Sequence, residues 1–138
     1  MRLTRRPVGR PELAKQPGEI QVQRVTPGVV LTRMRGHATL EHFAPIKSAV
    51  DAELEGGGRP AVFHDWEAMT GYDSAVRVAM ADWYRGVEDR VAEVHVLASN
   101  RMVAMGVAVV ALAVGARIQS HASRASFERA LGEAKRRA

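Results

Sequence analysis

Hydrophobic and polar positions alternate near the start of the chain, in two short segments on either side of a turn. EIQVQRV (19–25) alternates apolar and polar residues, which is typical of a half-buried strand. VVLTRMR (29–35) is a second such segment. Between them lies TPG, where the proline presets the first central position of a type II turn and Gly28 accepts the positive φ of the second. The pattern therefore predicts a β-hairpin.

Further along, two segments carry apolar residues three or four positions apart, which predicts amphipathic helices. In the first, at 39–55, a proline disturbs a helix interior, so we expect this helix to begin near Ala44 or to kink at Pro45. In the second, we expect Trp83 on the apolar side and Tyr84 half-exposed. The two apolar stripes consist of Leu40, Phe43, Ile46, Val50 and Leu54, and of Val76, Met80, Trp83, Val87 and Val91.

Three apolar strands and two further helices are predicted in the rest of the chain. They are the strands AVFHDW (61–66), EVHVLAS (93–99) and RIQSHA (117–122), a nearly all-apolar helix at 101–114, and a C-terminal helix containing Phe127 and Leu131. Strands that alternate with helices imply crossover connections and a parallel sheet. We therefore expect an α/β fold with a mixed, mostly parallel sheet of about five strands, an N-terminal hairpin at its edge, and about four helices.

The length of 138 residues fits a single domain, which we place at residues 19–138. Residues 1–18 hold three prolines and five basic residues, so we expect a disordered basic arm. The chain has no cysteine, which excludes disulfides and thiol chemistry. The longest uncharged run, Met102 to Ala116, has 15 residues, fewer than the roughly 20 of a membrane span. We expect a cytoplasmic protein without membrane insertion.

The net charge of +5 is concentrated at the two ends of the chain. Residues 1–18 and residues 117–138 each carry a charge of +4, and the body between them carries −3. Nucleic-acid-binding domains gather basic charge on one face, so this distribution argues against such a body. RRPVGRP (5–11) resembles an AT-hook, but Val8 and Glu12 stand where that motif has basic residues. We expect no DNA binding by the arm.

Residue sets that carry enzymatic chemistry are missing from the sequence. It has no Gly-rich phosphate loop, since GGG (56–58) follows a helix and not a strand. We therefore expect neither an enzyme nor a cofactor. His64, His95 and His121 lie on three predicted strands and are a set of ligands that zinc accepts. Polar positions at strand ends or on the solvent face are the alternative, which we favour over a metal site.

The segment MTGYDSAVR (69–77) places an Asp and a Ser directly before the second helix. The structural interpretation is helix capping by Asp73 or Ser74, supported by Thr70 in a Thr-x-x-acid box. We also expect an ion pair between Asp73 and Arg77, four positions apart on the helix. The functional interpretation is that Ser74 is modified or contacts a partner. One side chain can do both in different states.

Together with the element order, VFHDWEAMTGYDSA resembles the STAS domain of bacterial anti-sigma-factor antagonists, the SpoIIAA-like fold. There a strand ending in a polar residue, here Asp65, leads to Asp-Ser-Ser-Gly at the start of a helix. ASNRMVAMGVAVVALAVGARIQSHAS and ASFERALG are similar to the following strand, helix, strand and final helix. The resemblance covers about residues 20–133.

The resemblance implies a regulatory protein whose partner is a kinase that doubles as anti-sigma factor. Ser74 is then the phosphoacceptor, and Asp65, Tyr72, Asp73 and Arg77 are the candidate switch-loop and partner-binding residues. Ala75 and Val76 replace the second Ser and the Gly of the family pattern. They motivate an alternative, a phosphorylation-independent module that docks a partner or senses a small molecule.

Overall fold

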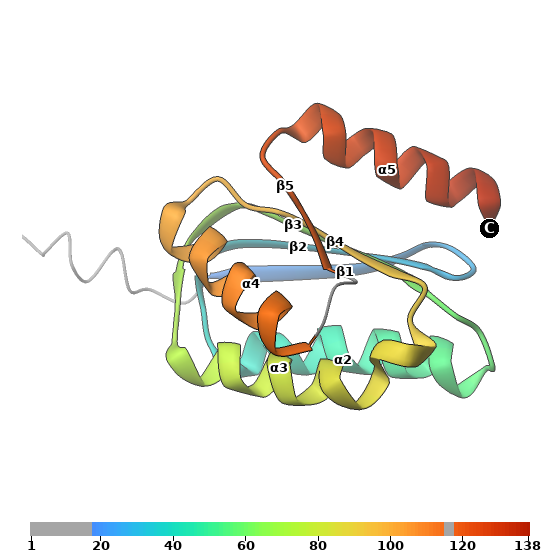
Figure 1. Cartoon of the computed structure of the whole chain (residues 1–138), viewed down its shortest axis with the longest axis horizontal. Coiled ribbons are helices and arrows are strands. Elements are labelled where there is room, and N and C mark those ends of the chain that lie inside the picture. The colour runs from blue at the N-terminus through green and yellow to red at the C-terminus, as the bar shows by residue number, and fades with distance from the viewer. Residues whose placement is uncertain (1–17, 115–117) are drawn as a thin grey trace, which may run out of the picture.

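A computed structural model of the chain describes residues 18–114 and 118–138 (Figure 1). The predicted arm therefore lies outside the described residues apart from Gly18. The elements are β1 Glu19–Thr26, β2 Val29–Ala38, α2 Leu40–Glu55, β3 Ala61–Tyr72, α3 Ser74–Val87, the short 3₁₀-helix η2 Glu88–Arg90, β4 Glu93–Leu97, α4 Arg101–Val114, β5 Ile118–His121 and α5 Arg124–Arg137.

The five strands form one sheet in the order β1-β2-β3-β4-β5. β1 pairs antiparallel with β2, and the pairs β2–β3, β3–β4 and β4–β5 are parallel. The predicted hairpin and the mostly parallel sheet are thereby confirmed. At the turn between β1 and β2, Gly28 has φ +85°, the left-handed conformation that glycine adopts without strain.

Helices cover the sheet unequally, with α2, α3 and α4 on one face and α5 on the other (Figure 1). We call these the three-helix face and the α5 face. The alternation of side chains along each strand supplies both cores. In β3, Val62 joins the larger core under the three helices, and Phe63 joins a smaller core with Phe127 and Leu131 of α5.

Two element boundaries differ from the prediction. β3 does not end near Asp65 but runs on to Tyr72, because β2 also continues to Ala38 and pairs with it through two register shifts. α2 does not begin near Ala44, and it is not interrupted at the proline. It begins at Leu40 and carries Pro45 inside, on an exposed position of its second turn.

The apolar side of α3 contains Tyr84 as well as Trp83, which packs against the larger core. Tyr84 is 2% exposed, whereas Trp83 is partly exposed and donates a hydrogen bond from its indole Nε1 to Asp51 of α2. Positions 83 and 84 both lie on helical spacing from Met80 and Val87, so spacing alone did not discriminate between them. The prediction that Tyr84 is half-exposed was therefore wrong.

Candidate functional site

Ser74 is an exposed residue at the first position of α3. Asp73 before it has extended backbone angles (φ −75°, ψ 141°) and occupies the N-cap position. The Asp73 carbonyl accepts a hydrogen bond from the Val76 N–H at 2.9 Å, which begins the helix. The structure thus presents the Ser74 hydroxyl to solvent at a helix N-terminus, where the peptide dipoles favour negative charge.

The Asp73 carboxylate does not cap the helix, contrary to one expectation. Its Oδ1 lies 2.8 Å from Nε2 of His37 on β2, and it makes no capping hydrogen bond. Thr70 lies within β3, so the expected Thr-x-x-acid box is also wrong. Because the carboxylate is turned toward β2, the first turn of α3 has no side-chain acceptor from Asp73 and remains available to another anion.

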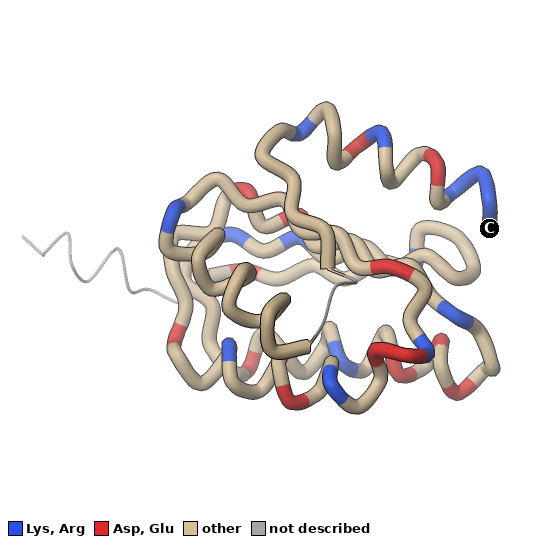
Figure 2. Tube along the Cα trace, viewed as in Figure 1, with Lys and Arg blue, Asp and Glu red and all other residues tan. Residues whose placement is uncertain are grey.

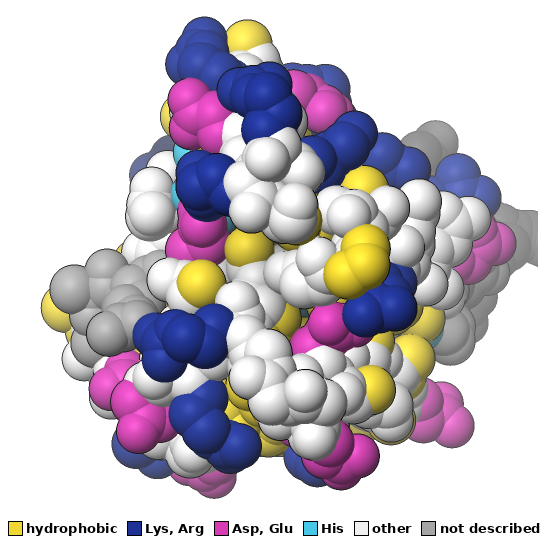
Figure 3. Space-filling model, turned by 90° about the vertical axis from the view of Figure 1, so that its right-hand side faces the viewer, with side chains coloured by type: hydrophobic (Ala, Val, Ile, Leu, Met, Phe, Trp, Pro, Cys, Tyr) yellow, Lys and Arg dark blue, Asp and Glu magenta, His cyan; other side chains and the backbone are white. Residues whose placement is uncertain are grey.

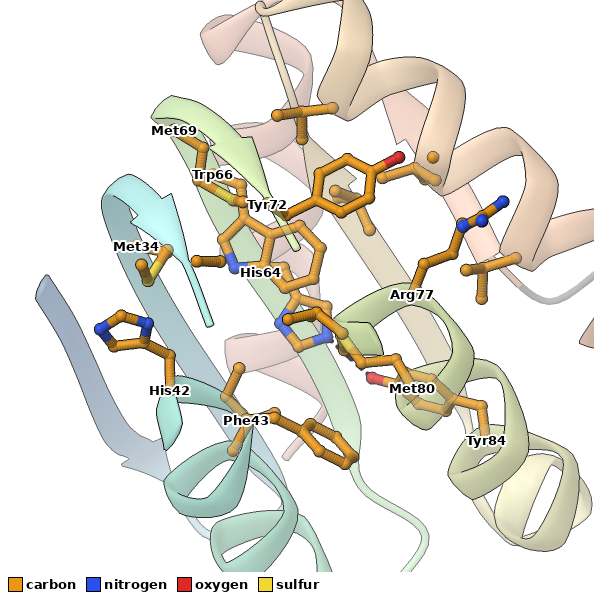
Figure 4. Close-up of a pocket in the computed structure, with 18 of the residues that line it drawn as sticks. Met34, His42, Phe43, His64, Trp66, Met69, Tyr72, Arg77, Met80 and Tyr84 are labelled. Carbon is orange, nitrogen blue, oxygen red and sulfur yellow. Dashed lines mark hydrogen bonds between the residues drawn. The ribbon is translucent and has the colours of Figure 1, made fainter. Parts of the chain in front are cut away.

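Tyr72 connects this segment to α4. It is the last residue of β3, and its ring extends toward α4 (Figure 4). A Cβ placed on Gly106 of α4 would lie 2.7 Å from Tyr72 Cζ, closer than side chains tolerate. The Asn100 amide also donates to the Thr70 carbonyl at 3.3 Å. The end of β3, which leads directly into α3, is therefore joined to the start of α4.

Arg77 does not form the expected ion pair with Asp73, whose carboxylate instead meets His37. Its side chain extends from α3 toward α4 (Figure 4), and its Nε is buried without a hydrogen-bond partner. A buried, unpaired N–H of a charged group is costly, and native proteins rarely retain one without a reason.

Asp65 lies away from the Ser74 segment, on the α5 face of the sheet. Its carboxylate accepts hydrogen bonds from Arg124 at 2.9 and 3.0 Å and lies 3.4 Å from Nε of Arg33. Arg124 also donates to the Glu67 carboxylate, and its hydrogen bonds to Glu67 and Asp65 raise the pKa of the Arg124 guanidinium. The expectation that Asp65 shares a switch loop with Asp73 and Ser74 is not supported by this geometry, because the side chain anchors α5.

The helix α4 presents an uninterrupted apolar surface to solvent. Beyond Arg101 it has no charged residue, as Figure 2 shows by its tan trace. The large exposed side chains recur every three or four positions; they are Met102 (64% exposed), Met105 (64%), Val109 (46%) and Leu112 (87%). We call these four residues the α4 stripe. Met102 and Met105 are therefore not part of the core.

Exposed apolar stripes of this kind mark interaction surfaces. The α4 stripe begins at the end of the sheet where Ser74 lies, because Tyr72 and Asn100 join the two helix starts. The far end of the molecule, which carries the β1–β2 turn, differs: basic and acidic side chains mix there with scattered hydrophobic ones (Figure 3). The beginning of the α4 stripe and the exposed Ser74 hydroxyl therefore lie at the same end of the molecule.

An apolar cavity of about 70 Å³ lies between the sheet and the three helices (Figure 4). Three methionines reach into it, together with aromatic and β-branched side chains. Its lining comprises Met34, Ala38, Thr39, His42, Phe43, Ile46, His64, Trp66, Met69, Tyr72, Val76, Arg77, Met80, Tyr84, Val94, Val96, Val103, Gly106, Val107, Val110 and Ile118.

Buried polar groups along the cavity wall satisfy one another. Nδ1 of His64 lies 2.8 Å from the Thr32 hydroxyl, and its Nε2 lies 2.7 Å from the Tyr84 hydroxyl. Trp66 Nε1 donates to the same Thr32 oxygen at 3.2 Å. A neutral imidazole offers one donor and one acceptor, which two hydroxyls can match. Burial lowers the pKa of His64 to about 3 and raises that of Tyr84, so both stay neutral.

The other two candidate histidines lie together on the α5 face. Nδ1 of His95 is 2.8 Å from Nε2 of His121, and the chain of contacts continues to Glu93 at 2.6 Å and to Ser126 of α5 at 2.6 Å. Burial, and the neighbouring His95, lower the pKa of His121. His64 and His95 are buried, so their expected placement on strand ends or the solvent face was wrong.

His64 is separated by the sheet from the other two, so the three imidazoles do not form one ligand set. In residues 18–114 and 118–138, no group of three His, Asp or Glu side chains is arranged to hold a metal ion. Within the same ranges, none of the helices has the length and hydropathy needed to cross a membrane.

The chain has the SpoIIAA-like, STAS-like fold. It aligns with the unphosphorylated anti-sigma factor antagonist SpoIIAA at a TM-score of 0.61 and 15% identity, over 83% of this chain and 99% of that one. The phosphorylated form of the Bacillus cell fate determinant SpoIIAA gives 0.56 and 16%, over 81% and 99%. An anti-sigma factor antagonist from Mycobacterium paratuberculosis gives 0.57 and 15%, over 88% and 98%. No family model and no curated protein sequence matches the chain.

Proposed function

We propose that this protein is a regulatory protein–protein interaction module that binds a protein partner at the end of the sheet where α3 and α4 begin. One observation carries the proposal: an exposed serine at the start of α3 lies at the same end as the beginning of the α4 stripe. An apolar stripe supplies affinity, and an adjacent hydroxyl supplies a position at which charge can be added.

Phosphorylation of Ser74 by a partner kinase is the proposed switch. A phosphoryl group adds a charge of about −1.5 to −2 at pH 7. At the first position of α3 it would accept hydrogen bonds from helix N–H groups that Asp73 leaves unused, so the fold tolerates it. The added charge would stand next to the Asp73 carboxylate and change the sign and hydration of the docking surface. The partner would then dissociate.

The similarity to phosphorylated and unphosphorylated SpoIIAA supports this choice of switch. The partner class that follows is a kinase of the anti-sigma type. The binding surface would comprise Ser74, Asp73 and Tyr72 together with the α4 stripe. Arg77 would contribute through its position one turn into α3.

The test uses the full chain with each anti-sigma-type kinase encoded in the source genome, in the presence of ATP and Mg²⁺. Intact mass should rise by one phosphate, and peptide mapping should place that phosphate on Ser74. Ser74→Ala should keep the partner bound, and Ser74→Glu should weaken binding at least tenfold. Ser48→Glu, an exposed serine on α2, is the matched charge control and should bind like wild type. A phosphate on another residue refutes the switch.

A second candidate function is a phosphorylation-independent docking or small-molecule-sensing module. Val76 favours it, since it stands where the family pattern has Gly and its side chain is buried in the larger core. The apolar cavity favours it as well. Equal partner binding by Ser74→Ala and Ser74→Glu would support this function over the phosphorylation switch.

A further inference from the structure

We infer that the cavity under the three helices binds a small aliphatic monocarboxylate, with the short apolar chain inside and the carboxylate on the guanidinium of Arg77. This inference rests on the small-molecule-sensing function proposed above and names the class of ligand. It depends on three features of the described residues: the space, the character of its lining and the unpaired Arg77 Nε.

The space is unusual for a protein interior, where side chains interdigitate and leave few voids larger than a water molecule. Its lining is apolar, since the ring nitrogens of His64 are already engaged by Thr32 and Tyr84. Water needs two to four polar partners in order to stay in a cavity, and this wall offers almost none. An apolar group is therefore the better occupant.

The charges of the lining residues indicate which chemical group the other end of the ligand carries. Among the described residues that line the cavity, Arg77 is the one with a permanent positive charge, and none of them is an Asp or Glu. The two lining imidazoles are engaged, His64 by hydroxyls and His42 by the Thr39 N–H and the Gly18 carbonyl. The unpaired Nε of Arg77 therefore matches an external anion, and a carboxylate pairs with a guanidinium through two parallel hydrogen bonds.

Volume sets the length of the chain. An engineered apolar cavity of about 150 Å³ holds benzene, and the cavity described here is about half that size. It fits a branched or linear alkyl chain of about four carbons. Three methionines line it, at positions 34, 69 and 80, and their flexible thioether chains can adjust to the shape of the guest.

The ligand would also lie close to the Ser74 segment. Arg77 is three residues after Ser74 on α3, and Tyr72, two residues before it, lines the same cavity. Tyr72 and Arg77 are only half-buried, so at these residues the lining reaches the surface. Binding would order both side chains next to the proposed docking surface, which gives a small molecule access to partner binding.

Titration of the ¹⁵N-labelled full chain with sodium isovalerate, followed by amide chemical shifts, tests the inference. We expect saturable shifts at residues around the cavity, with isovalerate binding at least tenfold more tightly than isovaleramide, which has the same shape without the charge. Acetate should bind more weakly because it leaves the cavity unfilled, and octanoate should bind more weakly because it exceeds it.

Two variants locate the carboxylate. Arg77→Gln should weaken isovalerate at least tenfold and leave isovaleramide unchanged. Arg85→Gln, which removes an exposed arginine of the same helix, should change neither. Equal affinity of wild type for acid and amide would overturn the carboxylate assignment while retaining a small-molecule site. No saturable shift with either compound would overturn both. Neither result affects the Ser74 test, which is read by partner binding.

Discussion

On the three-helix face, α2, α3 and α4 enclose an apolar cavity and leave the α4 stripe exposed, whereas on the other face α5 alone packs tightly on Phe63 and is fixed by charges. The two helices α4 and α5 have the same length of 14 residues but opposite surfaces (Figure 2). α4 is uncharged after its first residue, and α5 alternates acidic and basic side chains and ends in three basic ones.

Charged side chains on the α5 face form ion pairs with one another. Arg124 donates to Asp65, Glu67 and Glu128, and Arg137 pairs with Glu93 at the other end of the helix. These contacts join α5 to β3 and β4 and satisfy the charges locally. On the three-helix face the interior is adaptable, and the exposed α4 stripe has no charged residue after Arg101. We therefore expect binding on the three-helix face and a stabilising role for α5.

The largest expected effect is on stability, and it compares matched deletions in the two cores. Phe63→Ala should reduce the free energy of unfolding by about 3–5 kcal/mol, because Phe63 is fully buried between His95 and Phe127. Met80→Ala should reduce it by only about 2 kcal/mol, since part of its surroundings is already cavity. Urea denaturation measures both. An equal loss in the two variants would mean that the cores are packed alike.

The next largest effect is a loss of stability at low pH, which we expect from His64 on the three-helix face. Burial in the folded state lowers the pKa of His64 from 6.5 to about 3. Between these two pH values the unfolded chain therefore binds a proton at His64 that the folded chain does not bind. Stability from this group is therefore complete above pH 6.5 and decreases as the pH falls toward 3. Between pH 8 and pH 5 the loss should be about 2 kcal/mol.

Urea denaturation at pH 8, 6.5 and 5 measures this slope. His64→Gln should remove it, because glutamine can still reach the Tyr84 hydroxyl but does not titrate. His121→Gln, on the α5 face, should remove a smaller share, since His121 has its pKa lowered as well but is partly exposed. A His64→Gln variant that keeps the full slope would show that other groups cause it.

Much of this architecture was predictable from the sequence because its signals are local. The turn residues and the alternation on both sides of them predict the β1–β2 hairpin, helical spacing predicts α2, α3 and α5, and the length of an apolar run predicts α4. The order of elements then implies the parallel sheet. These patterns also predicted that Tyr72, Asp73 and Ser74 lie at the start of α3.

The remaining features depend on contacts between distant segments. Asp65 was expected at the end of its strand, whereas pairing with β2 extends β3 to Tyr72. Asp65 is two residues after Phe63, so the alternation along β3 puts it on the α5 face. The cavity has no sequence signal, since it is the volume that side chains of seven elements fail to fill. The unpaired Nε of Arg77 has no sequence signal either, because its burial depends on contacts between distant segments.

The smallest expected effect on stability comes from the α4 stripe, and it separates folding from binding. Met105→Lys and Leu112→Lys replace exposed side chains, so the free energy of unfolding should change by less than about 0.5 kcal/mol. If the stripe binds the partner, a buried lysine would have to be desolvated in the complex, and affinity should fall at least tenfold. Arg129→Ala on α5 is the control, because it changes an exposed side chain on the opposite face and should leave affinity unchanged. Full partner affinity in both lysine variants would remove the stripe from the docking surface and leave binding to the Ser74 segment alone.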